Sequence, residues 1–141
     1  MKISTKGRYA LRIMLDLAMH NNGEYISLTD IAKRQGVSNK YLEQIISKLN
    51  KAGFLMTARG FNGGYKLAKA PSEYSVGDIL RATEGEIAPI YCVVEGVECE
   101  KKEGCRTFEF WKGLDDVINS YIDSETLENL MEDRKKKDDI F

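Results

Sequence analysis

The feature of the sequence that most constrains the fold is a succession of three short amphipathic segments followed directly by a glycine-rich hairpin. Ser4 or Thr5 can cap a first helix, in which apolar side chains recur at helical spacing from Tyr9 to Ala18. Ser27 and Asp30 stand three positions apart, as in a capping box, and predict a second, shorter helix. Each segment carries its apolar residues along one face, so both helices are expected to pack against a core.

The third segment completes a helix-turn-helix. Ser38 is the expected N-cap of a helix whose apolar side chains run from Tyr41 to Leu49, and the turn before it contains Gly36. Residues 54–58 and 65–68 have the pattern of two strands around a glycine-rich turn, which predicts the hairpin called a wing. The predicted fold class is therefore mainly α with a small β wing, a winged helix-turn-helix followed by a long C-terminal helix.

The rest of the chain divides into a helix, an irregular loop and the long helix. Pro71 and the pair Ser75 and Asp78 predict a helix that ends near Gly85. Helical periodicity is absent from the next segment, which contains all three cysteines, and it returns in the long helix. The apolar stripe of that helix comprises Trp111, Leu114, Val117, Ile118, Tyr121 and Ile122. We expect four parts: the winged helix-turn-helix in residues 1–85, a cysteine loop in residues 86–105, the long helix and a short last helix in residues 106–131, and a disordered charged tail in residues 132–141.

The charges are sorted along the sequence. Residues 1–70 contain 12 Lys and Arg against 4 Asp and Glu, a net charge of +8, whereas residues 71–141 carry −9. Neutralising phosphates and releasing their counterions provides most of the non-specific affinity of proteins for DNA, so the N-terminal half is expected to bind a polyanion. Patches of one sign also arise by chance on solvated faces, but a division this large favours DNA binding.

The sequence gives no indication of a membrane protein. The most apolar stretch near the N-terminus, Tyr9 to Met19, is broken by Arg12 and Asp16. It is also shorter than the roughly 18–20 apolar residues that a membrane span requires. Since no targeting signal is recognisable, we expect a cytoplasmic protein.

The polar face of the third helix carries the side chains that can read base pairs. Asn and Gln can bond adenine, Glu can accept from cytosine, and Lys can reach phosphates or guanine. Any amphipathic helix has a solvated face, but the preceding capped helix and the following wing favour DNA reading. In the wing, Arg59 suits a narrow minor groove, and glycines allow a close approach of the backbone. The residues predicted to contact DNA are Lys2, Lys6, Arg8, Ser38, Asn39, Lys40, Tyr41, Glu43, Gln44, Lys48, Arg59, Gly60 and Gly63.

The three cysteines are candidate metal ligands. Cys92, Cys99 and Cys105 are separated by six and then five residues, within a segment rich in Glu and Lys. In a cytosolic chain such a set fits a metal or an iron–sulfur cluster better than a disulfide framework, and it lacks the Cys-x-x-Cys pairs of zinc fingers. The charged neighbours disfavour a role as small buried apolar residues. On spacing alone, a loop with a cluster and a loop without one both remain open.

The residue types present in the chain disfavour enzyme activity. A cysteine nucleophile needs a nearby base and a group that orients the base. The single histidine of the chain, His20, is expected at the end of the first helix. The glycine run from Arg59 to Gly64 is not closed by the Gly-Lys-Ser/Thr of a phosphate-binding loop. The sequence therefore predicts a regulator without catalytic activity.

Several short motifs resemble one family of bacterial regulators. They are Lys2-Ile3-Ser4-Thr5-Lys6-Gly7-Arg8-Tyr9-Ala10, Tyr41-Leu42-Glu43-Gln44, Arg59-Gly60-Phe61-Asn62-Gly63-Gly64-Tyr65, Ser75-Val76-Gly77-Asp78-Ile79 and Thr126-Leu127. In these segments the chain resembles the Rrf2 family of winged-helix transcription regulators, over residues 1 to about 131. The resemblance implies a homodimer joined through the long helix, from about residue 106 to 122. We therefore expect a dimeric regulator, acting as a repressor, that binds an imperfect palindrome in double-stranded DNA.

Within the resemblance, the cysteine loop matches the iron–sulfur cluster regulators of the family. Those members carry three cysteines here, and Cys92, Cys99 and Cys105 match them, which implies a cluster of the [2Fe–2S] type. The first cysteine gap is one residue longer in this chain, and Phe108 stands where those members have a histidine as fourth ligand. Some nitric-oxide-sensing relatives use an acidic ligand near the start of the first helix, where this chain has Arg8. Glu109, an acid of the partner subunit, water or a small thiol remain open as the fourth ligand.

The N-terminal segment also resembles the cysteine-metabolism branch of the family. Members of that branch generally lack the three-cysteine loop and respond to a partner enzyme. The alternative to cluster sensing is therefore a cluster-free repressor that a partner protein or thiol oxidation controls. In the cluster-binding interpretation, a bound cluster orders the cysteine loop and biases the spacing of two recognition helices, which must match about 34–36 Å, one turn of DNA, or a multiple of it.

Overall fold

Serine side chains cap the main helices of the N-terminal part, as the sequence predicts. The structure is a computed structural model and describes residues 1–135. Ser4, Ser27, Ser38 and Ser75 each accept a hydrogen bond from the backbone N–H three residues later, at 2.9–3.2 Å. The elements are α1 (Thr5–Met19), α2 (Leu28–Gln35), α3 (Asn39–Lys51), β1 (Leu55–Ala58), β2 (Gly64–Leu67), η1 (Pro71–Glu73), α4 (Val76–Glu84), η2 (Tyr91–Val93), η3 (Lys102–Gly104), α5 (Phe108–Ser124) and α6 (Leu127–Lys135).

The wing is a two-stranded antiparallel sheet. Strands β1 and β2 pair from Leu55 opposite Leu67 to Ala58 opposite Gly64, one residue from the predicted bounds. A bridge between Ile26 and Tyr65 joins the wing to the segment before α2. The mainly helical fold with a small β wing is thus confirmed, whereas the bridge links residues distant in sequence and was not predicted.

The main core lies around α1. Its buried side chains come from α1 to α4, from both strands, from the segment that follows the wing and from the start of α6. Helix α3 contributes Leu42, Ile45, Ile46 and Leu49. Tyr74 is 1% exposed, and its hydroxyl donates to Phe54 O at 2.8 Å while accepting from Lys69 N at 2.9 Å. The wing strands are therefore attached to the same core that orients α3.

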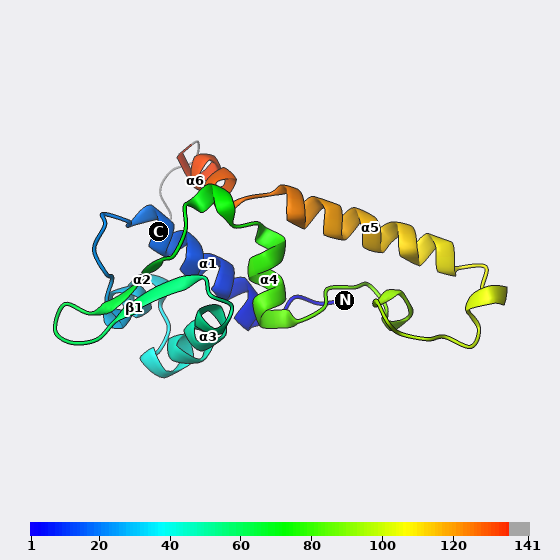
Figure 1. Ribbon diagram of the computed structural model, residues 1–141, viewed down its shortest axis with the longest axis horizontal. Helices are drawn as coiled ribbons and strands as arrows, with labels where there is room; N and C mark the ends of the chain where they lie inside the picture. Colours follow the sequence, from blue (N-terminus) through cyan, green and yellow to red (C-terminus); the bar gives the residue numbers. More distant parts are fainter. Residues whose placement is uncertain (136–141) are drawn as a thin grey trace.

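Helix α5 extends away from the winged body, and the cysteine loop runs outward beside it before the chain turns back (Figure 1). The base of this arm is a second apolar cluster formed by Val76, Leu80 and Ile87, against which Ile118 and Ile122 of α5 pack. The single apolar stripe predicted for the long helix is therefore divided between two faces. On the other face of α5, the side chains of Phe110, Val117 and Tyr121 are about two-thirds exposed.

The chain returns to the winged body through α6. Thr126 bridges to Ser75, and Leu127 is fully buried in the main core. Helix α6 runs to residue 135, so it is longer than the predicted short last turn, and residues 132–135, which were predicted to belong to a disordered tail, are helical. Residues 136–141 of that tail lie outside the described residues. Among residues 1–135, no helix is long and apolar enough to span a membrane.

Candidate DNA interface and cysteine loop

Helix α3 separates an apolar face from a polar face. Leu42, Ile45, Ile46 and Leu49 are buried in the core. The predicted contact residues Asn39, Lys40, Glu43, Gln44 and Lys48 are all exposed, and Ser47 lies among them. The structure therefore brings most of the predicted base-reading residues together on one accessible face.

Three predicted contacts at α3 also have structural roles. The Ser38 hydroxyl accepts from Tyr41 N at 3.1 Å, which caps the helix. The Tyr41 ring is half-buried and packs edge-on against Tyr9, with ring centroids 6.0 Å apart. Lys48 Nζ donates to Thr83 O at 3.3 Å, so this lysine also links α3 to the end of α4.

The wing presents Arg59 at the end of β1, next to the exposed Gly60, whose φ of +101° favours glycine. Its glycine-rich turn is tightly packed. A Cβ atom added to Gly63 would lie 2.3 Å from Ala58 O, and one added to Gly64 would lie 2.0 Å from Ile26 O. The glycines thus keep the turn narrow and close to the body of the domain. Phe61, at the tip, is fully exposed. It was not among the predicted contacts, because an apolar residue in a turn carries no group that can hydrogen-bond to a base.

The predicted phosphate contacts of the N-terminus lie around the start of α1. Lys2 and Arg8 are exposed and Lys6 is half-exposed. The segment is held by Glu84 of α4, whose Oε1 accepts from Ser4 N at 2.9 Å and also from the Ser4 hydroxyl. Gly7 is buried next to this contact. A Cβ atom added to Gly7 would lie 2.2 Å from Glu84 Oε1. The end of α4 therefore fixes the start of α1.

The three cysteines are free thiols at the outer part of the arm. Cys92 and Cys99 are half-buried and Cys105 is exposed. A hydrogen bond between the Cys92 and Cys99 side chains raises the pKa of the Cys92 thiol. Cys105 Sγ lies 3.3 Å from Thr107 Oγ1, and donation from this hydroxyl, followed by the N–H groups of Thr107 and Phe108, lowers the pKa of Cys105.

The donor chemistry of the cysteine loop fits an iron–sulfur cluster, because thiolates are the usual ligands of such clusters. The arrangement pairs Cys92 with Cys99 but leaves Cys105 bonded to Thr107. Among residues 1–135, no three Cys, His, Asp or Glu side chains converge as a metal-binding group. Cys105 would therefore have to move to complete a three-thiolate set.

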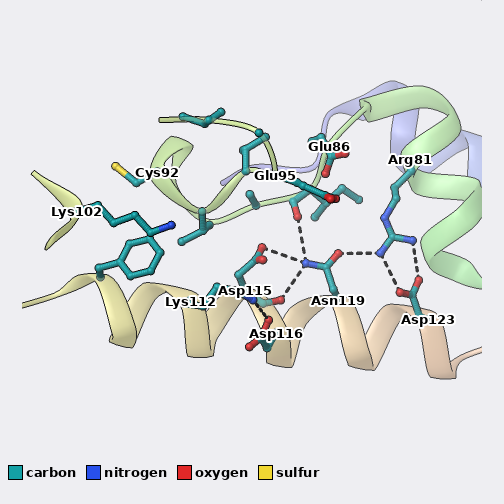
Figure 2. Close-up of a pocket in the computed structure, with 17 residues that line it drawn as sticks. Arg81, Glu86, Cys92, Glu95, Lys102, Lys112, Asp115, Asp116, Asn119 and Asp123 are labelled. Atoms are coloured by element: carbon teal, nitrogen blue, oxygen red, sulfur yellow. Dashed lines mark hydrogen bonds and ion pairs between the residues drawn. The ribbon is translucent and has the colours of Figure 1, made fainter. Parts of the chain in front are cut away.

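A polar hollow of about 570 Å³ separates the cysteine loop from α5, and Cys92 lines it (Figure 2). At its inner end, Arg81 of α4 donates to Asp123 at 2.7 and 3.1 Å and to Asn119 Oδ1 at 2.7 Å. Asn119 Nδ2 in turn donates to Ile87 O at 3.4 Å. The hydrogen bond with Asp123 raises the pKa of Arg81. This network connects α4, α5 and the start of the cysteine loop.

The single histidine of the chain takes part in a buried network instead of a catalytic site. His20 Nδ1 lies 2.9 Å from Asp16 O, at the end of α1 that points away from the cysteine loop (Figure 1). The Asp16 carboxylate is fully buried and accepts from Arg34 at 2.7–3.1 Å and from Gln35 at 2.8 Å. The hydrogen bond to Asp16 raises the pKa of Arg34. This clamp joins α1 to α2, and it was not predicted from the sequence.

Comparison with known proteins gives consistent matches over most of the chain. The family model for Rrf2, described as an iron-dependent transcriptional regulator, matches residues 3–133. The chain is 40% identical to the HTH-type transcriptional regulator IscR of Aliivibrio salmonicida, over 96% of this chain and 80% of that protein. It is 39% identical to the Protein rrf2 of Nitratidesulfovibrio vulgaris, over 94% and 89%.

Solved structures agree. CymR of B. subtilis, titled a global cysteine regulator, has a TM-score of 0.77 and 39% identity, covering 98% of this chain and 99% of that one. IscR of T. potens has a TM-score of 0.76 and 38% identity, covering 96% and 90%. The family model and IscR are named as transcriptional regulators, and CymR is titled a regulator; none of the three is named as an enzyme. The chain therefore belongs to the Rrf2 family and is a DNA-binding transcription regulator.

Proposed function

We propose that the protein is a cytoplasmic homodimeric repressor that binds palindromic promoter DNA. We propose further that an iron–sulfur cluster, held by Cys92, Cys99 and Cys105, modulates its binding to the operator. The observation that carries the DNA-binding part is the exposed polar face of α3 beside the wing that bears Arg59. A recognition helix in the major groove with an arginine in the minor groove is a common way to combine direct and shape readout.

The apolar face of α5 supports the homodimer. Phe110, Val117 and Tyr121 are about two-thirds exposed along this helix. Exposed apolar surface of this kind marks interaction sites, and a two-fold contact between two copies of the same face closes on itself. Two winged domains joined in this way would present two α3 helices to the two halves of a palindrome.

Regulation is proposed to pass through the arm. A bound cluster would supply iron–sulfur bonds that tie the three thiolates to one point. Cys105 lies three residues before the start of α5, and the Arg81, Asn119 and Asp123 network joins α5 to α4. Through Glu84 and Thr83, α4 contacts the start of α1 and Lys48 of α3. A change in how well the cysteine loop is ordered can therefore alter the distance between the two α3 helices of the dimer.

A cluster-free repressor of sulfur or cysteine metabolism, controlled by a partner protein or by thiol oxidation, is the second candidate. The similarity to CymR of B. subtilis favours it, and so does the interaction with Cys99 that raises the pKa of the Cys92 thiol. In this alternative those two thiols would respond to an oxidant without any metal.

The proposal is tested by selecting duplexes from a random pool with anaerobically purified protein. We expect a two-fold symmetric consensus whose half-sites lie about one helical turn apart or a multiple of it. We also expect visible absorbance that disappears when any one cysteine is replaced by Ala. An asymmetric or absent consensus would contradict the dimeric repressor. A colourless protein with a symmetric consensus would support the second candidate.

A further inference from the structure

We propose that the hollow between α3 and the wing is a seat for one sugar–phosphate strand of bound DNA, held by the uncharged side chains of Ser47, Asn50 and Thr57. The inference deepens the proposed function and rests on it. Asn50 and Thr57 were not among the predicted contacts, whereas Ser47 lies on the polar face of α3 that was expected to read DNA. Their role would be to fix where the two reading elements sit along the duplex.

The hollow has a volume of about 510 Å³ and is lined by residues of α3 and of the wing. One wall is a line of α3 side chains at positions i, i+4 and i+7, namely Glu43, Ser47 and Asn50. The opposite wall comes from the wing and includes Thr57 and Arg59. The seat therefore has one wall on each of the two elements expected to enter DNA grooves.

The distance between the walls is set by the fold. Ile26 N donates to Tyr65 O at 2.9 Å, and Tyr65 N donates to Ile26 O at 2.8 Å. Gly64 packs so closely against Ile26 that no side chain can be accommodated. The wing is thus attached to the segment before α2 and cannot swing away from α3 without breaking this bridge.

The geometry of B-DNA identifies the occupant. A helix fits the major groove, which is about 12 Å wide, and an arginine of the wing fits the narrower minor groove. Neighbouring major and minor grooves are separated by one sugar–phosphate strand. When α3 and Arg59 occupy adjacent grooves, that strand must pass through the space between them.

The lining has the chemistry that a sugar–phosphate strand requires. Ser47, Asn50 and Thr57 are exposed, and their side chains have no hydrogen-bond partner within residues 1–135. Hydroxyl and amide groups commonly donate to phosphate oxygens and so fix the register of a protein on DNA. Ile46 and Ala58 provide apolar surface in the same hollow, which suits the deoxyribose.

The position of Glu43 agrees with this assignment. Among the described residues that line the hollow, Glu43 is the only carboxylate, and it stands one turn closer to the N-terminus of α3 than Ser47. The N-terminal residues of a recognition helix contact base edges, while later residues approach the backbone. The carboxylate therefore lies on the side of the bases, and the uncharged donors lie on the side of the phosphates.

Uncharged donors have a signature that distinguishes them from lysine and arginine. Cationic contacts release counterions, so the loss of one lowers the slope of log K against log salt concentration. A hydroxyl or amide bond to a phosphate releases none. Its loss should weaken binding to every sequence without changing that slope.

The test measures the affinity of full-length Ser47→Ala, Asn50→Ala and Thr57→Val at several salt concentrations. The two probes are a duplex selected by the wild-type protein and an unrelated duplex of equal length. We expect each variant to bind both duplexes about three- to tenfold more weakly, with an unchanged salt slope. Thr57→Ser, which keeps the hydroxyl, should restore the affinity. Ser72→Ala, which removes an exposed hydroxyl on η1, is the matched control and should have no effect.

A second measurement locates the contact. Single methylphosphonates placed along the selected duplex should reveal one phosphate, between the major- and minor-groove contacts, whose neutralisation removes the effect of Asn50→Ala. Unchanged affinity in all three variants, a loss confined to the selected duplex, or a reduced salt slope would overturn the seat. If the wild-type protein binds neither duplex, the proposed function itself is wrong.

Discussion

At the scale of single residues, the polar face of α3 combines side chains that attract base edges with one that repels phosphates. Gln44 can bond adenine through its amide, whereas the Glu43 carboxylate is tolerated only opposite a donor such as cytosine N4. Both side chains are exposed on the same face. Glu43 should therefore act mainly by excluding wrong sites, and Gln44 by stabilising the right one.

Replacing these two residues should have opposite effects on specificity. Gln44→Ala should lose about 1–3 kcal/mol of binding free energy on the selected duplex and little on unrelated DNA. Glu43→Ala should keep its affinity for the selected duplex and bind a broader set of sequences, because the carboxylate that repels unmatched sites is removed. Binding to a randomised duplex library measures both. A uniform loss of affinity in Glu43→Ala would contradict the discriminating role.

The buried carboxylate of Asp16 is expected to be a major determinant of stability. Asp16→Ala removes the acceptor for Arg34 and Gln35 and leaves a guanidinium that has lost its counter-charge. Breaking such a pair costs about 3–5 kcal/mol, and the partial exposure of Arg34 favours the lower end. Urea denaturation should show this loss. Asp116→Ala, which breaks the exposed ion pair with Lys112, is the control and should leave the midpoint unchanged. Equal midpoints for the two variants would contradict the clamp.

The residue scale also shows what the sequence could predict. The N-caps at Ser27, Ser38 and Ser75 were predicted correctly, because a cap and its partner lie three residues apart. The partners of Asp16 lie 18 and 19 residues away on another helix. Nothing local indicates that an acid on an apolar helix face will meet them, so this clamp was missed.

At the scale of elements, α5 has two apolar faces with different partners. Ile118 and Ile122 pack on α4 and the start of the cysteine loop, while Phe110, Val117 and Tyr121 remain exposed. Helical periodicity predicted the apolar positions correctly but not their division. The division depends on where α4 lies in space, and a helical wheel does not contain that information.

Charging the exposed face of α5 should break the proposed dimer. Val117→Asp and Tyr121→Lys place a charge where a second copy would bury apolar surface, so sedimentation should show monomers with an intact circular dichroism spectrum. Lys112→Ala, on the other side of α5 by helical periodicity, should stay dimeric. The monomeric variants should also bind half-sites weakly. If both Val117→Asp and Tyr121→Lys form dimers as tightly as the wild-type protein, the dimer interface lies elsewhere.

At the scale of the whole molecule, the basic half of the sequence forms the elements from α1 to β2, whereas the acidic remainder contains the arm together with α4 and α6. The net +8 of residues 1–70 lies on the elements that carry α3 and the wing. The acidic arm should keep DNA on the winged face by repelling phosphates. Both the charge division and the fold class were predictable, since they depend on residue order.

Salt dependence tests this distribution. Lys6→Ala and Arg8→Ala should each weaken binding to all sequences and lower the salt slope by about one unit, because each removes one phosphate contact. Fluorescence anisotropy with selected and unrelated duplexes gives both quantities. A changed sequence preference with an unchanged slope would show that these residues contact bases.

The central claim is that the cysteine loop controls DNA binding through an iron–sulfur cluster. The most direct measurement is iron and acid-labile sulfide analysis of anaerobically purified protein, followed by titration of the selected duplex with the loaded form, the metal-free form and Cys92→Ala. We predict bound iron and sulfide in the wild-type protein and none in the variant. The operator affinity of the loaded form should differ from that of the other two, which should agree with each other, while all three remain folded. Wild-type protein without iron or sulfide, or equal operator affinity of the loaded and metal-free forms, would contradict the claim.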